Sequence, residues 1–335
     1  MKIRVGTFNL FQFVEPPYSW YVKKDKFTQE QWIEKTTWIK KQITSMDCDV
    51  IGFQEVFSQN ALKDLCKELG FEYFVTVDTP RVHEKNELVY VSTTVALASK
   101  HPISNIKNVK THTPSLKKHH FKGPFKFART PIKADVTLPN DQTFTIYVCH
   151  LKSNRENEFE YIFNEKHTLE EKNKQVQKAL KENFSKSLKQ RLCEASSLFF
   201  DMKKQKDKPY ILVCDLNDRL HSLTIDALSN NKYHDETRKE TFILKDAYYE
   251  HERKIYNPHP EQKEIKREAT SYFVGKGNVL DFIFISNALS KKNTKSVANI
   301  DNYEIFNEHI EENHDGSILK SDHAQVVCQL NFKKN

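Results

Sequence analysis

Short apolar segments that end in a polar, chemically reactive residue constrain this chain more than any other feature. Ile211–Cys214 runs directly into Asp215, and Tyr147–Cys149 runs directly into His150. Apolar and β-branched runs of about four to eight residues are typical of buried strands. Since the ends of neighbouring strands meet at the rim of a sheet, the pattern predicts a sheet whose rim carries functional side chains.

Similar apolar runs recur along the chain and predict its strands. We expect strands at Ile3–Leu10, Asp49–Gln54, Glu72–Val77, Val89–Ser99, Lys133–Leu138, Thr143–His150, Tyr210–Cys214, Leu280–Ser286 and His323–Leu330. Helical spacing predicts a helix over Thr28–Ser45, with Thr28 as its N-cap, and a second over Ser58–Leu69, ending before Gly70. Strands that first alternate with helices and later follow one another predict a mixed α/β (α+β) fold.

The longest polar region lies at about 156–206. It contains neither proline nor glycine, and Leu180, Phe184, Leu188 and Leu192 recur at intervals of four. This spacing predicts one or two helices with a solvated face, in a helical insertion after the strand that ends at His150. No change of composition separates two cores, so we expect a single domain over 1–335.

Net charge and cysteine spacing indicate the kind of substrate and the cellular compartment that suit this chain. Lys and Arg number 52 against 45 Asp and Glu, a net charge of +7 that suits an anionic substrate but is modest for a dedicated nucleic-acid coat. None of the six cysteines shows C-x-x-C spacing, which favours buried thiols in a reducing compartment. We find no signal peptide or transmembrane segment in the sequence, and we expect a cytoplasmic monomer.

Six polar clusters follow or interrupt the apolar strands. Each alone fits a turn or a solvated strand end, because charged residues are mostly exposed. Together they place carboxylates, amides and imidazoles at one rim, in the segments Thr7–Leu10, Gly52–Val56, Tyr147–Ser153, Ile211–Asp218, Val279–Phe284 and Ser321–His323. Hard oxygen ligands with few imidazoles favour Mg²⁺ or Mn²⁺ over Zn²⁺. A phosphate-binding glycine loop and a G-x-S-x-G elbow are both missing from the sequence.

The ordered set T-F-N, F-Q-E-V, C-H-L-K-S, C-D-L-N-D, L-D-F-I and S-D-H resembles the motifs of the endonuclease/exonuclease/phosphatase superfamily. The resemblance extends from Asn9 to His323 and is closest to bacterial members of unassigned substrate. It implies a deoxyribonuclease-I-like fold, a four-layer sandwich of two mixed β-sheets flanked by helices. It also implies an active site at one rim of that sandwich.

The resemblance implies a role for each matching residue. Glu55 looks like the principal ligand of Mg²⁺, or of Mn²⁺ as the alternative ion, with Asn9 and Asp322 in support. Asp215 resembles the residue that activates water, and Asn217 the amide that orients it. His323, paired with Asp281, and His150 look like phosphate-contacting imidazoles; Arg129 and Lys152 are candidates for substrate binding. For Arg129, an exposed arginine that caps the next strand is the alternative.

The aromatic segment Phe11–Phe27, just after Asn9, also has two interpretations. Its aromatic and lysine side chains suit base stacking at the rim, whereas packing over the first helix is the simpler alternative, which we favour.

The function implied is a metal-dependent hydrolase of phosphate esters that uses a metal- and Asp-activated water. We favour a nuclease-like phosphodiesterase whose substrates include nucleic acid, with a phosphomonoesterase or a sphingomyelinase-like lipid phosphodiesterase as alternatives. Inositol 5-phosphatases are disfavoured, because Asn217-Asp218-Arg219 and Asn278–Asp281 depart from their pattern. A catalytically silent binding module would lack one of Glu55, Asp215, Asn217 and His323, and all four are present. Nucleic-acid binding without hydrolysis would need a more basic face.

Overall fold

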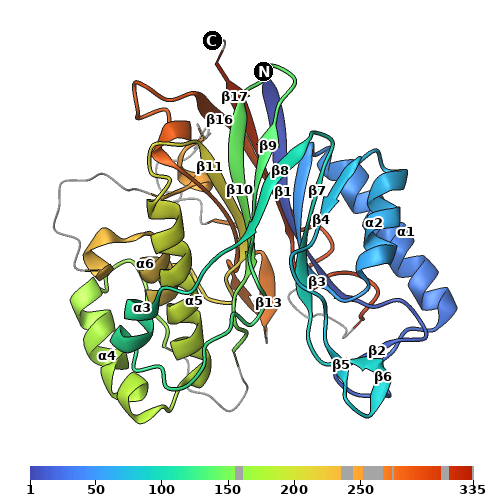
Figure 1. Ribbon diagram of the computed structural model, residues 1–335, viewed down its shortest axis with the longest axis horizontal. Helices are drawn as coiled ribbons and strands as arrows, with labels where there is room; N and C mark the ends of the chain where they lie inside the picture. Colours follow the sequence, from blue (N-terminus) through green and yellow to red (C-terminus); the bar gives the residue numbers. More distant parts are fainter. Residues whose placement is uncertain (155–160, 235–243, 252–266, 274, 311–316, 334–335) are drawn as a thin grey trace, which may run out of the picture.

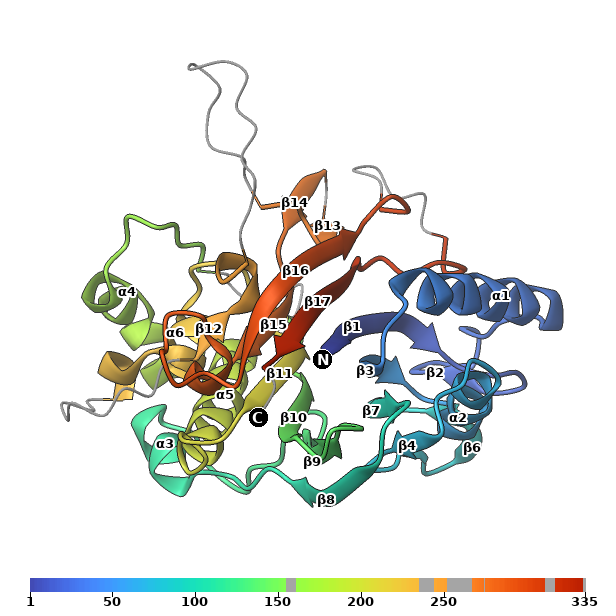
Figure 2. The ribbon, with the colours of Figure 1, turned by 90° about the horizontal axis from the view of Figure 1, so that it is seen from above.

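The computed structural model describes residues 1–154, 161–234, 244–251, 267–273, 275–310 and 317–333. Two six-stranded sheets stand face to face, and helices cover the outer face of each (Figure 1). The view from above shows the same succession of helix, sheet, sheet and helix (Figure 2). The predicted four-layer sandwich of mixed sheets is therefore confirmed.

Sheet I contains both terminal strands of the chain. Its order is β16-β17-β1-β3-β7-β4, with β1 Lys2–Phe13, β3 Val50–Val56, β4 Tyr73–Val75, β7 Thr94–Ser99, β16 Ala298–Phe306 and β17 Gln325–Phe332. Strands β1 and β3 are parallel, while β17 pairs with β1 in the antiparallel sense. Two smaller sheets accompany it: β2 Ser19–Trp20 with β5 Val82–His83 and β6 Asn86–Tyr90, and β13 Ser271–Phe273 with β14 Lys276–Asn278.

Sheet II has the order β12-β15-β11-β10-β9-β8. Its strands are β8 Ile103–Asn108, β9 Ile132–Thr137, β10 Thr143–His150, β11 Tyr210–Asp215, β12 Lys245–Asp246 and β15 Asp281–Ile285. Strands β10 and β11 are parallel neighbours, which requires a crossover connection between them. Helices α4 Leu169–Glu182 and α5 Lys186–Lys203 lie in that connection, so two helices occupy the predicted polar region. Residues 155–160 of that region lie outside the described residues.

Helices α1 Gln29–Met46 and α2 Gln59–Glu68 cover sheet I. Thr28 caps α1 as predicted, because its hydroxyl accepts from the Gln31 amide and the Gln31 side chain accepts from the Thr28 amide. Helices α5 and α6 Leu223–Ser229 pack on sheet II, beside α3 Thr113–Lys118 and α4. The remaining helices are short 3-10 segments at Asn231–His234, Ala247–Tyr249 and Asn287–Leu289. Among the described residues, no helix combines the length and apolar character needed to cross a membrane.

Three rings of the aromatic segment Phe11–Phe27 pack inward, the arrangement favoured from the sequence. Phe13, Trp20 and Phe27 are almost fully buried. The rings of Phe13 and Trp32 lie 4.8 Å apart, and those of Trp20 and Phe27 lie 4.9 Å apart. These three rings are therefore part of the core under α1 and are not available for base stacking, whereas Tyr21 exposes 46% of its surface.

The two sheets approach each other closely at Gly52 of β3. A Cβ built there would lie 2.4 Å from a methyl of Val213 in β11 and 2.9 Å from a methyl of Val148 in β10. Valines from both sheets fill the space around this contact. The absent side chain thus lets the two sheets meet directly behind the rim.

We expect Gly52→Ala to destabilise the fold by about 1–3 kcal/mol, because the new methyl must displace two packed valines. Urea unfolding followed by circular dichroism measures this change. A matched substitution at Gly70, where no atom lies within 4 Å but the φ angle is +84°, separates backbone strain from overpacking. An unchanged midpoint for Gly52→Ala would contradict the close contact.

Some strands differ from those predicted. The expected strand over Val89–Ser99 is two strands, because β6 joins a separate small sheet and β7 joins sheet I. Strand β16 was missed, since its pairing with β17 shifts register between Ile300 and Asn302 and this shift interrupts the alternation of apolar residues. Strand β8 was missed because, as an edge strand, it is exposed over most of its length.

Candidate active site

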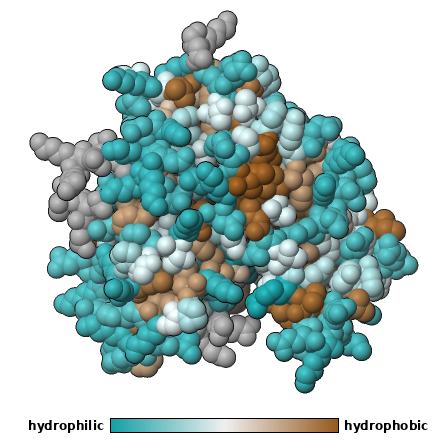
Figure 3. Space-filling model, in the orientation of Figure 1, coloured by the Kyte–Doolittle hydropathy of each residue, from teal (hydrophilic) through white to brown (hydrophobic). Residues whose placement is uncertain are grey.

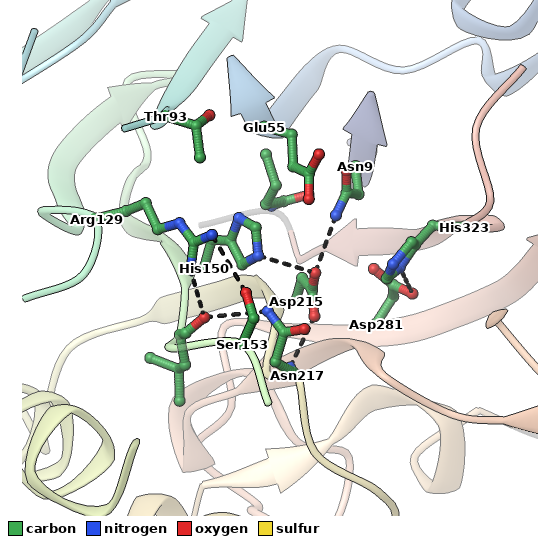
Figure 4. A network of polar contacts seen from close by, with 12 residues as sticks. Asn9, Glu55, Thr93, Arg129, His150, Ser153, Asp215, Asn217, Asp281 and His323 are labelled. Atoms are coloured by element: carbon green, nitrogen blue, oxygen red, sulfur yellow. Dashed lines mark hydrogen bonds and ion pairs between the residues drawn. The ribbon is translucent and has the colours of Figure 1, made fainter. Parts of the chain in front are cut away.

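Three of the candidate residues form one row across sheet II. His150 at the end of β10 pairs in register with Asp215 at the end of β11, and Asp215 pairs with Asp281 at the start of β15. Val148, Val213 and Ile283, two residues away on each strand, point into the core between the sheets. Because side chains alternate along a strand, all three polar residues point toward sheet I. Figure 4 shows them opposite Asn9 and Glu55.

Asp215 lies at the centre of the cluster and is almost fully buried. Its Oδ2 accepts from the Asn9 side-chain amide at 2.9 Å and lies 3.3 Å from Nε2 of His150, while its Oδ1 accepts from the Asn217 backbone at 2.8 Å. Burial raises the pKa of Asp215 to about 7; the charge on His323 opposes that shift and the charge on Asp281 adds to it. A carboxyl group of this kind takes up a proton near neutral pH.

His150 differs from a protonated phosphate ligand. Burial, reinforced by the positive charge of Arg129, holds its pKa well below the ordinary value, so the ring is neutral. With Nε2 turned to Asp215, its Nδ1 has no hydrogen-bond partner among the described residues. That nitrogen can accept a hydrogen bond from water or a substrate hydroxyl, whereas a bond to phosphate requires the other tautomer.

Asn217 is held in a strained conformation. Its φ angle is +49°, and its side-chain amide donates to the Leu151 carbonyl at 3.1 Å. The same carbonyl accepts from Nη1 of Arg129 at 3.0 Å. The amide of Asn217 therefore joins the loops after β10 and β11, and it lies within reach of the groups around Asp215.

His323 pairs with Asp281 across the two sheets. Nδ1 of His323 lies 2.8 Å from Oδ2 of Asp281. Burial alone would lower the pKa of His323, but the carboxylates of Asp281, Asp215 and Asp322 outweigh burial and raise it well above the ordinary value. The imidazole is therefore a charged donor at neutral pH.

The backbone on each side of this pair is fixed by hydroxyl groups. The Thr270 hydroxyl accepts from the Asp281 amide at 3.1 Å. The Ser321 hydroxyl accepts from the His323 amide at 3.0 Å and donates to the Asn9 carbonyl at 2.6 Å. These bonds hold the His323 loop against β1, so the imidazole from sheet I meets a carboxylate from sheet II.

Glu55 reaches the site through an irregularity in β3. Strict alternation would direct it toward the helices with Phe53, but its φ angle is +58° and the pairing of β3 shifts register on both sides. Its carboxylate accepts from the Gln12 amide at 3.0 Å. Burial, and then the negative charge of Asp322, raise the pKa of Glu55. Two acidic groups thus repel each other at one point of the rim.

The donor chemistry fits a hard divalent cation. Oδ1 of Asp322 and Oδ1 of Asp281 are buried and have no hydrogen-bond partner among the described residues. A cation near Glu55 and Asp322 would relieve their repulsion and use an oxygen that nothing else satisfies. Asn9 is a weaker candidate as a metal ligand, because its Oδ1 already accepts a hydrogen bond from the Phe11 amide at 3.0 Å.

A second group of ligand-type atoms is also present. Asp215, Asp281 and His323 each offer an atom within 4.8 Å of the others. The hydrogen bond within this group uses Nδ1 of His323 and Oδ2 of Asp281, which leaves Oδ1 of Asp281 without a partner among the described residues, so the group is a second candidate for the cation. The ligand set expected from the sequence, Glu55 with Asn9 and Asp322, is the one we carry forward as a proposal.

Arg129 is buried, whereas Lys152 lines a groove. The Arg129 side chain is 9% exposed and donates to the Leu151 carbonyl and, at 3.3 Å, to the Ser153 hydroxyl. The alternative of an exposed surface arginine is therefore wrong. Lys152 lines a groove beside this cluster, together with residues such as Ala128.

Glu194 of α5 was missed by sequence analysis, since it lies on a helix with no motif. It is fully buried, and its carboxylate accepts from the amides of Ala128 at 2.6 Å and Lys152 at 2.8 Å, and from the Gln190 side chain at 2.9 Å. Its neighbour Arg191 donates to the Lys152 carbonyl at 3.1 Å. Helix α5 thus positions the two loops that carry Arg129 and His150.

Lys35 of α1 was missed for the same reason. It is fully buried, donates to the Ile318 carbonyl at 2.8 Å and lies over the Phe27 ring. Burial lowers its pKa to about 7, against the attraction of Asp322 and Glu55. When protonated, its ammonium group balances part of the negative charge at the rim, and it loses that proton as pH rises above about 7.

We expect Glu194→Gln to lower kcat/KM for a phosphodiester by about 10–100-fold. The glutamine NH2 group would face one of the two loop amides, so one hydrogen bond is lost and Arg129 is misplaced. The unfolding free energy should fall by about 1–3 kcal/mol. Exposed Glu34 of α1 provides the matched Glu→Gln control. Loss of stability with unchanged kcat/KM in the folded variant would restrict Glu194 to a structural role.

Comparison with known proteins identifies the family and similar folds. Residues 6–323 match the family model described as "Endonuclease/Exonuclease/phosphatase family". No curated protein matches the sequence. Among solved structures, the human Nocturnin catalytic domain with bound sulfate anion is similar with a TM-score of 0.59 and 16% identity, over 99% of this chain and 94% of that one.

Two further structures have similar folds. A humanized D. rerio TDP2 aligns with a TM-score of 0.54 and 12% identity, over 98% of this chain and 99% of that one. An endonuclease/exonuclease/phosphatase from Bacteroides vulgatus aligns with a TM-score of 0.54 and 14% identity, over 99% of this chain and 100% of that one. At these identities the structures establish the fold.

Proposed function

This chain belongs to the endonuclease/exonuclease/phosphatase family, and on that premise we propose that it is a metal-dependent phosphodiesterase of nuclease-like specificity. Members of the family are hydrolytic phosphoesterases that generally use a divalent metal ion. The observation that carries the proposal is the meeting, at one rim, of a buried carboxylate with a high proton affinity and a charged imidazole from the opposite sheet.

Asp215 is the residue we assign to the attacking water. It is held by donors on both oxygens, which leaves it oriented, and its raised pKa lets it accept a proton at neutral pH. Proton removal by a positioned base contributes about 10²–10⁴-fold to rate. Asn217, fixed beside it, orients the water or donates to the phosphate after a small rotation.

His323 is the residue we assign to the developing negative charge. Attack on phosphorus places charge on the non-bridging and leaving oxygens, and a charged donor held in place stabilises it. Asp281 keeps the ring protonated and turned so that Nε2 faces the site. Arg129 adds a second cation next to the same rim.

Glu55 and Asp322, with Asn9 beside them, are the residues we assign to the metal ion. A bound Mg²⁺ or Mn²⁺ would neutralise charge on a phosphate oxygen there. All of these donors are oxygens, which favours the hard cations over Zn²⁺. The positive charge of Lys35 and Arg129 limits how much charge remains for a cation to neutralise.

We expect the thermal midpoint of the wild type to rise in 5–10 mM Mg²⁺ or Mn²⁺ (roughly 100 times an assumed dissociation constant would stabilise by about 2.7 kcal/mol) and to fall back with EDTA. Glu55→Gln should abolish the rise, because it removes one of the repelling charges that attract the cation. Glu34→Gln is the control. An equal rise in Glu55→Gln would place the ion elsewhere, for example at Asp215, Asp281 and His323.

A panel of substrates tests the proposed reaction. Bis(p-nitrophenyl) phosphate, p-nitrophenyl phosphate, single-stranded and duplex DNA, RNA and sphingomyelin vesicles are each incubated with the protein in Mg²⁺ or EDTA. The proposal predicts turnover of bis(p-nitrophenyl) phosphate and of at least one nucleic acid, in Mg²⁺ only. Turnover confined to the monoester, or to sphingomyelin, would replace it with one of the two alternatives.

A further inference from the structure

A groove beside the active site is lined largely by lysine. It has a volume of about 540 Å³ and lies between the 120–128 segment, Lys152 and the turn from α4 to α5. Six of its twelve lining residues are lysines and none is acidic: Lys122, Lys126, Lys152, Lys181, Lys186 and Lys189. Over α3, α4 and α5 the surface is mostly hydrophilic, with small apolar patches among the polar side chains (Figure 3).

Two residues of the groove wall lie on the same loops as active-site residues. Ala128 in its wall precedes Arg129, and Lys152 follows His150 by two residues. Glu194 accepts hydrogen bonds from the amides of both Ala128 and Lys152. One buried carboxylate therefore fixes the wall of the groove and the phosphate side of the site to the same helix.

Three of the groove lysines carry a positive charge that no described acidic group pairs with. Lys122, Lys126 and Lys186 are exposed, and none of them has a salt bridge among the described residues. Lys189 is buried and donates to the His120 carbonyl at 3.2 Å; burial and the charge of Lys122 both lower its pKa. Like charges gathered in one place favour an extended polyanion.

Aromatic rings accompany these lysines. Phe121 lines the groove, and the Phe125 ring meets it edge-on at 5.2 Å, which holds its orientation. Phe184, in the turn between the groove residues Asn183 and Lys186, exposes 61% of its surface. Lysines interleaved with aromatic rings are typical of sites for single-stranded nucleic acid, where bases stack and phosphates pair with cations.

We propose that this groove binds a single-stranded polynucleotide, whose backbone runs from the groove into the active site. The proposal rests on the proposed phosphodiesterase function and specifies its substrate. A recessed, cationic groove with ring faces suits a flexible strand of phosphates and bases better than it suits a membrane, which favours a protruding apolar surface. The bases of a duplex are paired and stacked on one another, so they are not available to stack on these rings.

Binding is measured first, in EDTA, so that hydrolysis plays no part. Fluorescence anisotropy follows a labelled 12-nucleotide single strand, as DNA and as RNA, in increasing salt. The variant Lys122→Ala/Lys126→Ala/Lys186→Ala removes three exposed charges, and Lys63→Ala/Lys67→Ala/Lys295→Ala removes three exposed charges elsewhere. The groove variant should bind at least about tenfold more weakly, with its salt slope reduced by about 2, and the control should bind like wild type.

The role of the rings is tested separately by Phe121→Leu. Loss of a stacked base should weaken binding by about fivefold or more without changing the salt slope. A duplex of equal length should bind more weakly than the single strand. Equal binding of the duplex, or equal weakening by the two triple variants, would overturn the proposal, as would binding of phosphatidylserine vesicles but not of the oligonucleotide.

Hydrolysis then separates the groove from the reaction. In Mg²⁺, the groove variant should lose at least about tenfold in kcat/KM for the 12-nucleotide strand, mainly through KM, and keep wild-type kcat/KM for bis(p-nitrophenyl) phosphate. Failure of the groove proposal leaves both substrates unaffected by the variant. Failure of the proposed function leaves both substrates unhydrolysed while anisotropy still reports on the groove.

Discussion

Asp215→Asn is expected to lower kcat for a phosphodiester by about 10³-fold with little change in KM. The amide cannot accept the proton of the attacking water, while its oxygen can still accept from the Asn217 backbone. Wild-type kcat/KM should fall below neutral pH as Asp215 becomes protonated, because its pKa is raised to about 7. The residual activity of the variant should lack this acidic limb. Steady-state kinetics from pH 5 to 9 (roughly the span around the raised pKa) measures both effects.

The control for this substitution is Asp64→Asn on the exposed face of α2. Circular dichroism and Mg²⁺-dependent thermal shifts must show that Asp215→Asn is folded and still binds the ion. An active Asp215→Asn enzyme with an unchanged acidic limb would move the base to another residue, with His150 the nearest candidate at 3.3 Å.

Asp281→Asn is expected to lower kcat/KM by about 10²-fold at neutral pH and by more above it. Removing this carboxylate takes away the largest of the charges that raise the pKa of His323 against burial, so this pKa falls and the ring loses its proton at a lower pH. In the wild type the charged form persists to high pH because the folded-state pKa is raised. The alkaline limb of the pH profile should therefore move toward neutrality in the variant.

His323→Gln is the companion variant, since it keeps a donor but loses the charge. It should lose about 10²–10³-fold at every pH and show no such alkaline limb. For Asp281→Asn, the matched control is Asp301→Asn, because Asp301 lies in an exposed ion pair with Lys2. If Asp281→Asn lost activity equally at pH 6 and pH 9, the aspartate would position the backbone or the ring and would not maintain its charge.

Sequence patterns located the strand ends that carry this chemistry. Asp215 and His150 follow continuous apolar runs, so their strands could be predicted, but runs buried on both faces show no alternation, and only the structure gives the side of the sheet on which these residues lie. The pairing of His323 with Asp281, 42 residues earlier in the chain, came from family resemblance, because nothing local brings two different sheets together. We also propose that the chain forms one domain, since β1 and β17 from the two ends share a core with β10 and β11.

Other parts of the site could not be predicted, for physical reasons. Glu55 is directed inward by a register shift and a positive φ angle that no residue pattern signals. Glu194 lies on a helix buried on several faces, which its sequence does not signal, whereas Lys35 falls at helical spacing with Trp32, Ile39 and Ile43 on the buried face of α1, a signal that could have indicated it. The lysine groove joins segments from 120 to 190, so its charge density appears only after folding.

The most direct test of a metal-dependent phosphodiesterase is a Mg²⁺ titration of EDTA-treated wild-type protein with bis(p-nitrophenyl) phosphate as substrate. The rate should be at background in EDTA, rise to saturation with Mg²⁺, and stay at background for Asp215→Asn at every concentration. A rate that is independent of Mg²⁺, or that survives equally in Asp215→Asn, would contradict the assignment of this rim as the catalytic centre.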